Sequence, residues 1–296
     1  MKNTKIAVRI SIVTIVSNIF LAIIKFLAGI LSNSGAMVSD AIHTTSDVAT
    51  TIIAMVGVSL GNTEEDESHR YGHERMECVA SLLLSFILLI TGFEIGLNGF
   101  RLLLENNYDS IKTPGIFALI VAVISIILKE IMFQYTIRGA KKIKSDALKA
   151  DAWHHRSDAL SSIGALIGIA LSRFGYKFAD PLASIIIAIM ICKVAIDIFR
   201  EATDKLVDKS CDEEQIEKIK KVVLKQKGVL GIDDIKTRIF GSKIYVDIEI
   251  SADGKKSLND THAIAEKVHN KVENNFSNIK HIMVHVNPYR SDKNEK

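Results

Sequence analysis

The sequence has few cysteines and little net charge, and both shortages limit what the chain can do. Its 296 residues include three cysteines, Cys78, Cys192 and Cys211, which form neither a CxxC pair nor a disulfide framework. This pattern fits a soluble part that faces a reducing compartment. The formal net charge is +3, and the basic residues are spread along the chain instead of gathered in one patch. A nucleic-acid partner is therefore not expected.

Apolar residues are abundant, and they are segregated along the chain. Hydrophobic residues make up 48% of the sequence, although 24% of it is charged. Long apolar runs fill residues 1–200, residues 201–290 are rich in Lys, Glu and Asp, and residues 291–296 form a polar tail that we expect to be disordered. We therefore predict one domain embedded in a membrane and one small globular domain.

Six segments are predicted to be transmembrane helices, because a bilayer core of about 30 Å needs roughly 20 residues of helix. They cover residues 10–31, 36–60, 76–102, 114–135, 152–171 and 181–198. The first follows basic residues as a signal peptide would, but it is too long for a signal sequence and lacks a cleavage motif. We interpret it as a retained span.

Loop charges predict the orientation of these spans. Five basic residues lie between Arg138 and Lys149, after the fourth span, whereas residues 32–35 contain no Lys or Arg. Positive residues favour the cytoplasmic side of a membrane. We expect both termini and the loops at 61–75 and 136–151 to be cytoplasmic, in a multi-pass protein of the cell membrane.

After residue 200 the periodicity changes to that of a small α+β domain. Helices are predicted at residues 212–227 and 258–276, and strands at residues 229–239, 243–250 and 280–286. Phe240-Gly241-Ser242 is predicted to be the turn of a hairpin. The predicted order is helix, strand, strand, helix, strand, or αββαβ.

The second and fifth spans each carry an HxxxD pair. His43 and Asp47 are four residues apart, as are His154 and Asp158, so each pair shares one helix face. A charged side chain within a span costs roughly 2.5–3.5 kcal/mol, so it needs a partner. Together these residues, here called the His/Asp quartet, would supply two imidazoles and two carboxylates. That set suits tetrahedral Zn²⁺ and also admits Cd²⁺, Co²⁺, Fe²⁺ or Mn²⁺.

Other interpretations of these polar residues are open. They could be groups near helix ends that snorkel or form hydrogen bonds. His155 lies off the shared face and is expected to support the site or to lie at an interface. Asp40, one turn before His43, is a candidate for the ion pathway or for accepting an imidazole N–H.

The chain resembles the cation diffusion facilitator family in SNSGAMVSDAIHTTSD, HRYGHERME and DAWHHRSDALSSIGALIG. The resemblance implies a six-helix membrane domain followed by a metallochaperone-like cytoplasmic domain that dimerises. It implies that the quartet exports a divalent metal from the cytoplasm in exchange for protons, by alternating access. The expected partners are divalent metal ions, protons, lipid and a second copy of the chain. We expect no resident cofactor; the metal, with Zn²⁺ favoured, is the substrate and a candidate regulator.

The resemblance extends to a loop and to the region after the last span. Asp66, His69 and His73 match the family's second, cytoplasmic metal site, although a solvated charged loop is the alternative. Arg75 matches a basic residue that pairs, in the family, with an acid after the sixth span. Here that acid would be Asp208.

The C-terminal domain departs from the family pattern. Asp233 and Glu249 stand where the family often has histidine, His262 and His285 are kept, and Asn287 stands where an acid is common. This set could bind metal weakly, prefer a harder ion, or bind none. Its residues would then be surface polar groups on a dimerising module.

Two functions of other classes are alternatives to transport. In an intramembrane metalloenzyme the HxxxD pairs would hold a catalytic zinc, but nothing resembles HExxH and four protein ligands leave no open position for water. A metal sensor or non-transporting assembly partner would use the C-terminal domain, and the intact quartet argues against it.

Imidazole binds metal in its neutral form, so protons and metal would compete for the quartet, as transport coupled to protons requires.

Overall fold

The computed structural model describes residues 2–31, 35–105, 116–173, 179–241 and 243–289. The chain divides into two compact units, residues 1–203 and 204–296. Residues 32–34, Ser242 of the predicted turn and the predicted tail at 291–296 lie outside the described residues.

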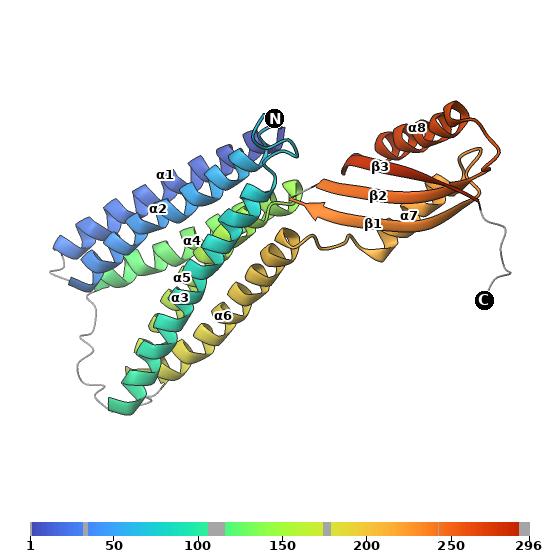
Figure 1. Ribbon diagram of the computed structural model, residues 1–296. Coiled ribbons are helices and arrows are strands. Elements are labelled where there is room, and N and C mark those ends of the chain that lie inside the picture. Colours follow the sequence, from blue (N-terminus) through green and yellow to red (C-terminus); the bar gives the residue numbers. More distant parts are fainter. Residues whose placement is uncertain (1, 32–34, 106–115, 174–178, 242, 290–296) are drawn as a thin grey trace. The chain divides into compact units, whose positions relative to one another are not determined.

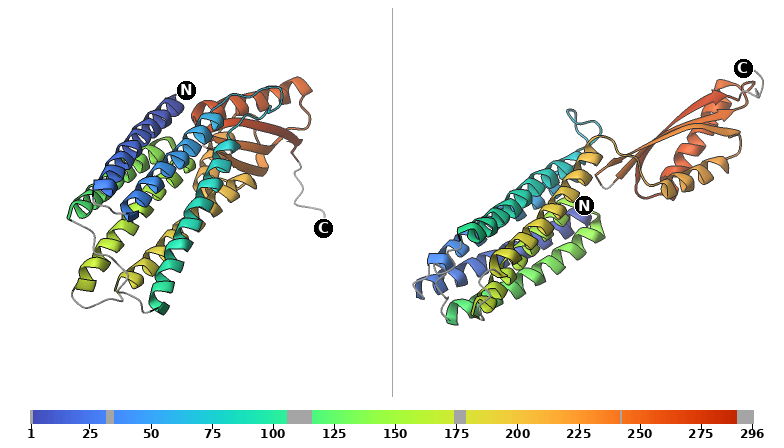
Figure 2. Two further views of the ribbon diagram at one scale, coloured as in Figure 1. Left: turned by 90° about the vertical axis from the view of Figure 1, so that its left-hand side faces the viewer. Right: turned by 90° about the horizontal axis from the view of Figure 1, so that it is seen from below.

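The first unit contains six long helices within the described residues (Figure 1). They are α1 (Lys2–Leu31), α2 (Gly35–Gly61), α3 (Arg75–Glu105), α4 (Ile116–Ile143), α5 (Asp146–Arg173) and α6 (Ala179–Leu206). The helices run alongside one another in all three views of Figures 1 and 2. α5 contacts α2, α3 and α4, so the helix with the second HxxxD pair lies inside the bundle.

Four helices are long and apolar enough to cross a membrane by length and composition, within the described residues. They cover Asn3–Leu31, Asp40–Gly61, Arg75–Leu104 and Ile120–Ile143. α5 and α6 have 28 residues each. At about 1.5 Å per residue such a helix is roughly 42 Å long, which exceeds a bilayer core of about 30 Å. The helices extend beyond the predicted spans because hydropathy marks only the apolar part of a helix.

One half of the bundle is closely packed. Its core lies near the ends joined by the α2–α3 and α4–α5 connections, and it contains small and aliphatic side chains: Ala54, Val58, Ala80, Leu84, Ile143, Ala147 and Leu148. Gly57 of α2 lies so close to α3 that an added Cβ would collide with the Cβ of Ala80. Little space is left between the helices in this half.

The second unit is the predicted αββαβ domain. It comprises α7 (Glu213–Leu224), β1 (Gly231–Phe240), β2 (Lys243–Ala252), α8 (Leu258–Asn275) and β3 (Ile279–Pro288). The sheet order is β1-β2-β3, with β1 antiparallel and β3 parallel to β2. The core joins both helices to the sheet: Ile219, Val223, Ile264, Val268, Val246, Ile248 and Ile250. α8 begins after Ser257, whose hydroxyl accepts the backbone N–H of Asp260.

Candidate metal sites

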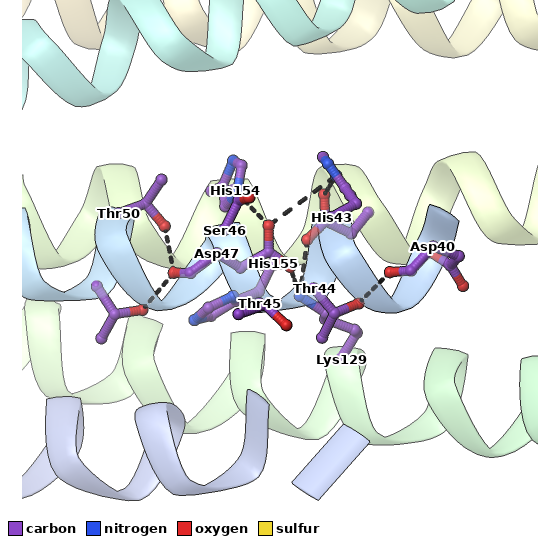
Figure 3. A network of polar contacts seen from close by, with 12 residues as sticks. Asp40, His43, Thr44, Thr45, Ser46, Asp47, Thr50, Lys129, His154 and His155 are labelled. Atoms are coloured by element: carbon purple, nitrogen blue, oxygen red, sulfur yellow. Dashed lines mark hydrogen bonds and ion pairs between the residues drawn. The ribbon is translucent and has the colours of Figure 1, made fainter. Parts of the chain in front are cut away.

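The His/Asp quartet converges from α2 and α5 inside the first unit. Figure 3 shows His43, Asp47 and His154 of the quartet together with Lys129. The Nε2 atom of His154 lies 3.3 Å from Oδ1 of Asp47. The Nε2 atom of His43 lies 3.9 Å from Oδ1 of Asp47 and 3.9 Å from Oδ1 of Asp158. The two carboxylates are buried, with side chains 2% and 10% exposed. Residues spaced for one helix face therefore do meet across two helices.

These separations are close to those of a metal's ligand shell. Bond lengths of about 2.0–2.1 Å in a tetrahedral zinc site place neighbouring ligand atoms about 3.3–3.5 Å apart. Ligand atoms of His43, Asp47 and Asp158 all lie within 4.8 Å of one another, and His154 is in contact with Asp47. Three quartet members are thus close enough to share one ion, and His154 contacts that group through Asp47.

Lys129 of α4 is a member of this site that was not predicted from the sequence. Its Nζ atom lies 2.6 Å from Oδ2 of Asp47 and 2.8 Å from Oδ2 of Asp158, and its side chain is 3% exposed. The ammonium therefore holds one oxygen of each quartet carboxylate. A signal was available, because a lysine in the middle of an apolar span needs an anionic partner.

His155 does not join the quartet. It is fully buried, and its Nε2 atom lies 3.6 Å from Oδ2 of Asp151. The other carboxylate oxygen of Asp151 accepts a hydrogen bond from the hydroxyl of Thr51, at 3.0 Å. The pair lies on the side of the quartet toward the start of α5, and Thr51 ties it to α2.

A polar cavity of about 230 Å³ adjoins the quartet. Besides quartet members and Lys129, its lining includes Lys25, Asp40, Thr44, Thr91, Glu94, Ile95, Asn98, Ser125, Ser161 and Ser162. Asp40 pairs with Lys25, with Oδ2 2.9 Å from Nζ. Asp40 precedes His43 in α2, Asn98 is near the end of α3, and Ser162 follows Asp158 in α5. The cavity thus extends away from the closely packed half.

The loop after α2 brings Asp66, His69 and His73 together. Nδ1 of His69 lies 3.5 Å from Oδ1 of Asp66, and Nε2 of His73 lies 3.3 Å from Oδ2. The backbone N–H groups of His69 and Ser68 donate to the Asp66 carboxylate at 2.7 and 2.9 Å. The hydrogen bond from His69 is the main cause that lowers the pKa of Asp66 below its usual value.

Within the described chain, no three of the predicted C-terminal ligands have ligand atoms within 4.8 Å of one another, although Asn287 joins two of them. The amide of Asn287 donates to Asp233 and to Glu249, at 3.1 Å each. His262 lies on α8, with Nε2 3.8 Å from Oε1 of Glu266. His285 is exposed on β3, in register with Glu249. A metal site made of these residues stays a prediction.

Arg75 lies in the first unit and Asp208 in the second. The ion pair predicted between them therefore stays a prediction.

Comparisons with known proteins cover almost the whole chain. Residues 11–207 match the family model of the cation efflux transmembrane domain, and residues 211–289 match that of the cation efflux protein cytoplasmic domain. An uncharacterized transporter of Methanocaldococcus jannaschii is 38% identical over 275 residues, 93% of this chain and 96% of its own. The manganese efflux system protein MneP of Bacillus subtilis is 30% identical over 295 residues, 96% and 97% of the two chains. A solved MamM CTD structure in a cadmium form is 22% identical and covers 26% of this chain and 98% of its own, with a TM-score of 0.26.

Proposed function

This chain belongs to the cation efflux, or cation diffusion facilitator, family, and from that premise we propose that it exports a divalent transition metal, preferably Zn²⁺, in exchange for protons. The observation that carries the proposal is the convergence of the His/Asp quartet from α2 and α5. Family membership supports a membrane transporter, and we propose no enzymatic activity.

The donor set supports the choice of metal. Two imidazole nitrogens and two carboxylate oxygens suit Zn²⁺, whereas Mn²⁺ sites favour oxygen ligands. A relative is called a manganese efflux protein, so Mn²⁺ is the competing substrate. Imidazoles bind metal only when neutral, so protonation of His43 and His154 would oppose metal binding and favour release.

Lys129 adds a second competitor for the site. Its ammonium holds Asp47 and Asp158 at 2.6 and 2.8 Å, and an incoming metal needs the same two carboxylates. We infer that the metal displaces the ammonium toward the cavity, which Ser125 and Lys129 of α4 both line. When the metal leaves, the ammonium returns. The empty carrier therefore never leaves two carboxylates uncompensated at membrane depth, where such charges are costly.

The cavity supports an inference about which side of the membrane the quartet faces. The basic connection between α4 and α5 favours a cytoplasmic position for that end of the bundle. Residues packed near that end, such as Ala147 and Leu148, are fully buried, whereas the cavity extends toward Asn98 and Ser162. On this orientation, with both termini in the cytoplasm, the quartet opens to the outside, as expected of a metal-releasing state.

The cytoplasmic parts complete the proposal. Asp66, His69 and His73 would form a second metal site on the cytoplasmic side. Residues 211–289 match a cytoplasmic domain whose family model is named for dimerisation, which supports a homodimer. We propose no resident cofactor, since the metal itself is the substrate.

Metal flux into proteoliposomes with an imposed pH gradient tests this function. We expect the pH gradient to drive uptake of Zn²⁺, measured beside uptake of Cd²⁺, Co²⁺, Fe²⁺ and Mn²⁺. This uptake should be lost in Asp158→Ala and in His154→Ala. The elution volume of both variants in size-exclusion chromatography should be unchanged. Unimpaired flux in either variant would refute the site. Faster flux of Mn²⁺ than of Zn²⁺ would overturn the metal, and flux that ignores the pH gradient would overturn proton exchange. No flux of any metal would favour a sensor.

A further inference from the structure

A separate group of metal-ligand side chains lies where α8 meets β3 in the second unit. His269 and Glu273 come from α8, and His281 comes from β3. Nε2 of His269 and Nδ1 of His281 each lie 3.2 Å from the same atom, Oε1 of Glu273. All three ligand atoms lie within 4.8 Å of one another. The group shares no residue with the transport quartet, the loop cluster or the C-terminal set predicted from the sequence.

The two nitrogen–oxygen separations match a metal's ligand shell. Neighbouring ligands of a tetrahedral zinc ion are about 3.3–3.5 Å apart. The two imidazole nitrogens lie within 4.8 Å of each other, so three ligand atoms are close enough to surround one ion after modest side-chain rotation. Two histidines and a glutamate are also a ligand set that zinc accepts with a fourth position open to water. The side chains are 34%, 31% and 45% exposed in chain order, so water reaches them.

The fold holds these three side chains in place. The backbone N–H of Ile282, a fully buried residue of β3, donates to Oε1 of Glu273 at 3.2 Å. The ring of His281 packs edge-on against His269, with centroids 5.3 Å apart, and against Tyr245, at 6.5 Å. A ligand set oriented by backbone and ring contacts loses less conformational freedom when an ion binds.

A second His–Glu pair on α8 provides a comparison for the group at His269. His262 and Glu266 have the same four-residue spacing, with Nε2 3.8 Å from Oε1, but their side chains are 70% and 65% exposed. Within the described chain no third ligand joins them. Such a pair is an ordinary helix-surface contact. The difference at His269 and Glu273 is the third ligand that β3 supplies.

We propose that His269, Glu273 and His281 bind one divalent transition-metal ion, such as Zn²⁺, within a single chain, with water as the fourth ligand. The ion would connect α8 to β3, two elements whose contact closes the core of the second unit. Binding would therefore stabilise the folded second unit, whether or not the quartet transports metal.

Zinc stoichiometry in the full-length protein tests the site. In detergent micelles at pH 7.5, equilibrium dialysis against Zn²⁺ should show one ion fewer per chain in His281→Asn and in Glu273→Gln. The matched control Glu266→Gln, at the same spacing on α8, should bind as many ions as the unsubstituted protein. His281→Cys, which restores a ligand, should retain the ion. Unchanged stoichiometry in both test variants, or equal loss in the control, would overturn the proposal.

A measurement on the unsubstituted chain covers the case in which a variant fails to fold. Zn²⁺ should slow the modification of His269 and His281 by diethyl pyrocarbonate at least about fivefold, and the same protection should appear in Glu266→Gln. The protection should persist in Asp158→Ala, which removes a quartet ligand, so failure of the transport site and failure of this site are distinguishable. Equal rates for His269 and His281 with and without Zn²⁺ would contradict the assignment.

Discussion

The charged ends of Lys129 and Asp158 meet, with Nζ 2.8 Å from Oδ2, although the residues are 29 positions apart and belong to different helices. The same ammonium lies 2.6 Å from Oδ2 of Asp47. One cation from α4 thus links the two helices that carry the HxxxD pairs. The Lys129 ammonium occupies carboxylate oxygens that a transported metal needs. Substitution of Lys129 therefore tests whether the ammonium and the metal compete.

Replacing this lysine by an uncharged residue of similar length should tighten metal binding and slow transport. In Lys129→Met, Zn²⁺ no longer competes with the ammonium for the two carboxylates. The unit charges of the ammonium and a carboxylate, taken about 4 Å apart, interact by about 4 kcal/mol at an effective dielectric constant of 20. We expect Zn²⁺ to bind at least about tenfold more tightly. The maximal uptake rate should fall at least about tenfold, because release is slower and the empty site has two uncompensated carboxylates. Titration calorimetry and proteoliposome uptake measure the two quantities.

Lys25→Met is the matched control, since Lys25 lines the same cavity but pairs with Asp40, at 2.9 Å. It should change Zn²⁺ affinity less than Lys129→Met does. Weaker Zn²⁺ binding in Lys129→Met would contradict competition and would instead make Lys129 a residue that positions the carboxylates.

The neighbouring histidines of α5 should differ sharply in function. His154 contacts Asp47 at 3.3 Å, whereas His155 is fully buried beside Asp151. We expect His154→Asn to abolish saturable Zn²⁺ binding at the quartet. His155→Asn should keep Zn²⁺ affinity within about threefold and lower the temperature of unfolding, because it disturbs a buried polar contact. Calorimetry and a thermal-shift assay check the pair; equal loss of binding in both variants would contradict the geometry.

Much of the fold and the quartet could be predicted from the sequence because both depend on short spacings. Four-residue steps place His43 with Asp47, and alternating apolar residues define the strands of the αββαβ domain. Lys129 was not predicted, because its partners lie on two other helices and no spacing within α4 points to them. The helices also extend beyond the predicted spans, since polar turns continue a helix without adding to its hydropathy.

The His269 group shows the same limit in the second unit. Spacing within α8 makes His262–Glu266 and His269–Glu273 equivalent, and the family resemblance predicts a metal ligand only at His262. Only the position of β3, which brings His281 to Glu273 at 3.2 Å, separates the two pairs. The contact between α8 and the strand that follows it, which spacing within the helix does not reveal, decides where the three ligands meet.

Access to the quartet should be greater from outside the cell than from the cytoplasm in the metal-free protein. Ser162 lines the cavity, whereas Ala150 is 1% exposed and belongs to the closely packed half. With Cys192 replaced by Ser, we expect Ser162→Cys to react with a membrane-impermeant thiol reagent in right-side-out vesicles. Ala150→Cys should react slowly from either side. Faster reaction of Ser162→Cys from the cytoplasmic side would contradict the assigned orientation.

The loop at Asp66 should keep its hydrogen-bonded form well into the acidic range. The N–H groups of His69 and Ser68 stabilise the carboxylate and lower its pKa below the ordinary 3.8. For an acid with a lowered folded pKa, the stabilisation is present above the unfolded pKa and is lost as pH falls through the folded value. In NMR spectra of the micelle-embedded protein without metal, the amide shifts of Ser68 and His69 should therefore report a carboxylate titration with a midpoint below 3.8. In Asp66→Asn that titration should vanish. A midpoint at or above 3.8 in the unsubstituted chain would show that these N–H groups do not hold the carboxylate in solution.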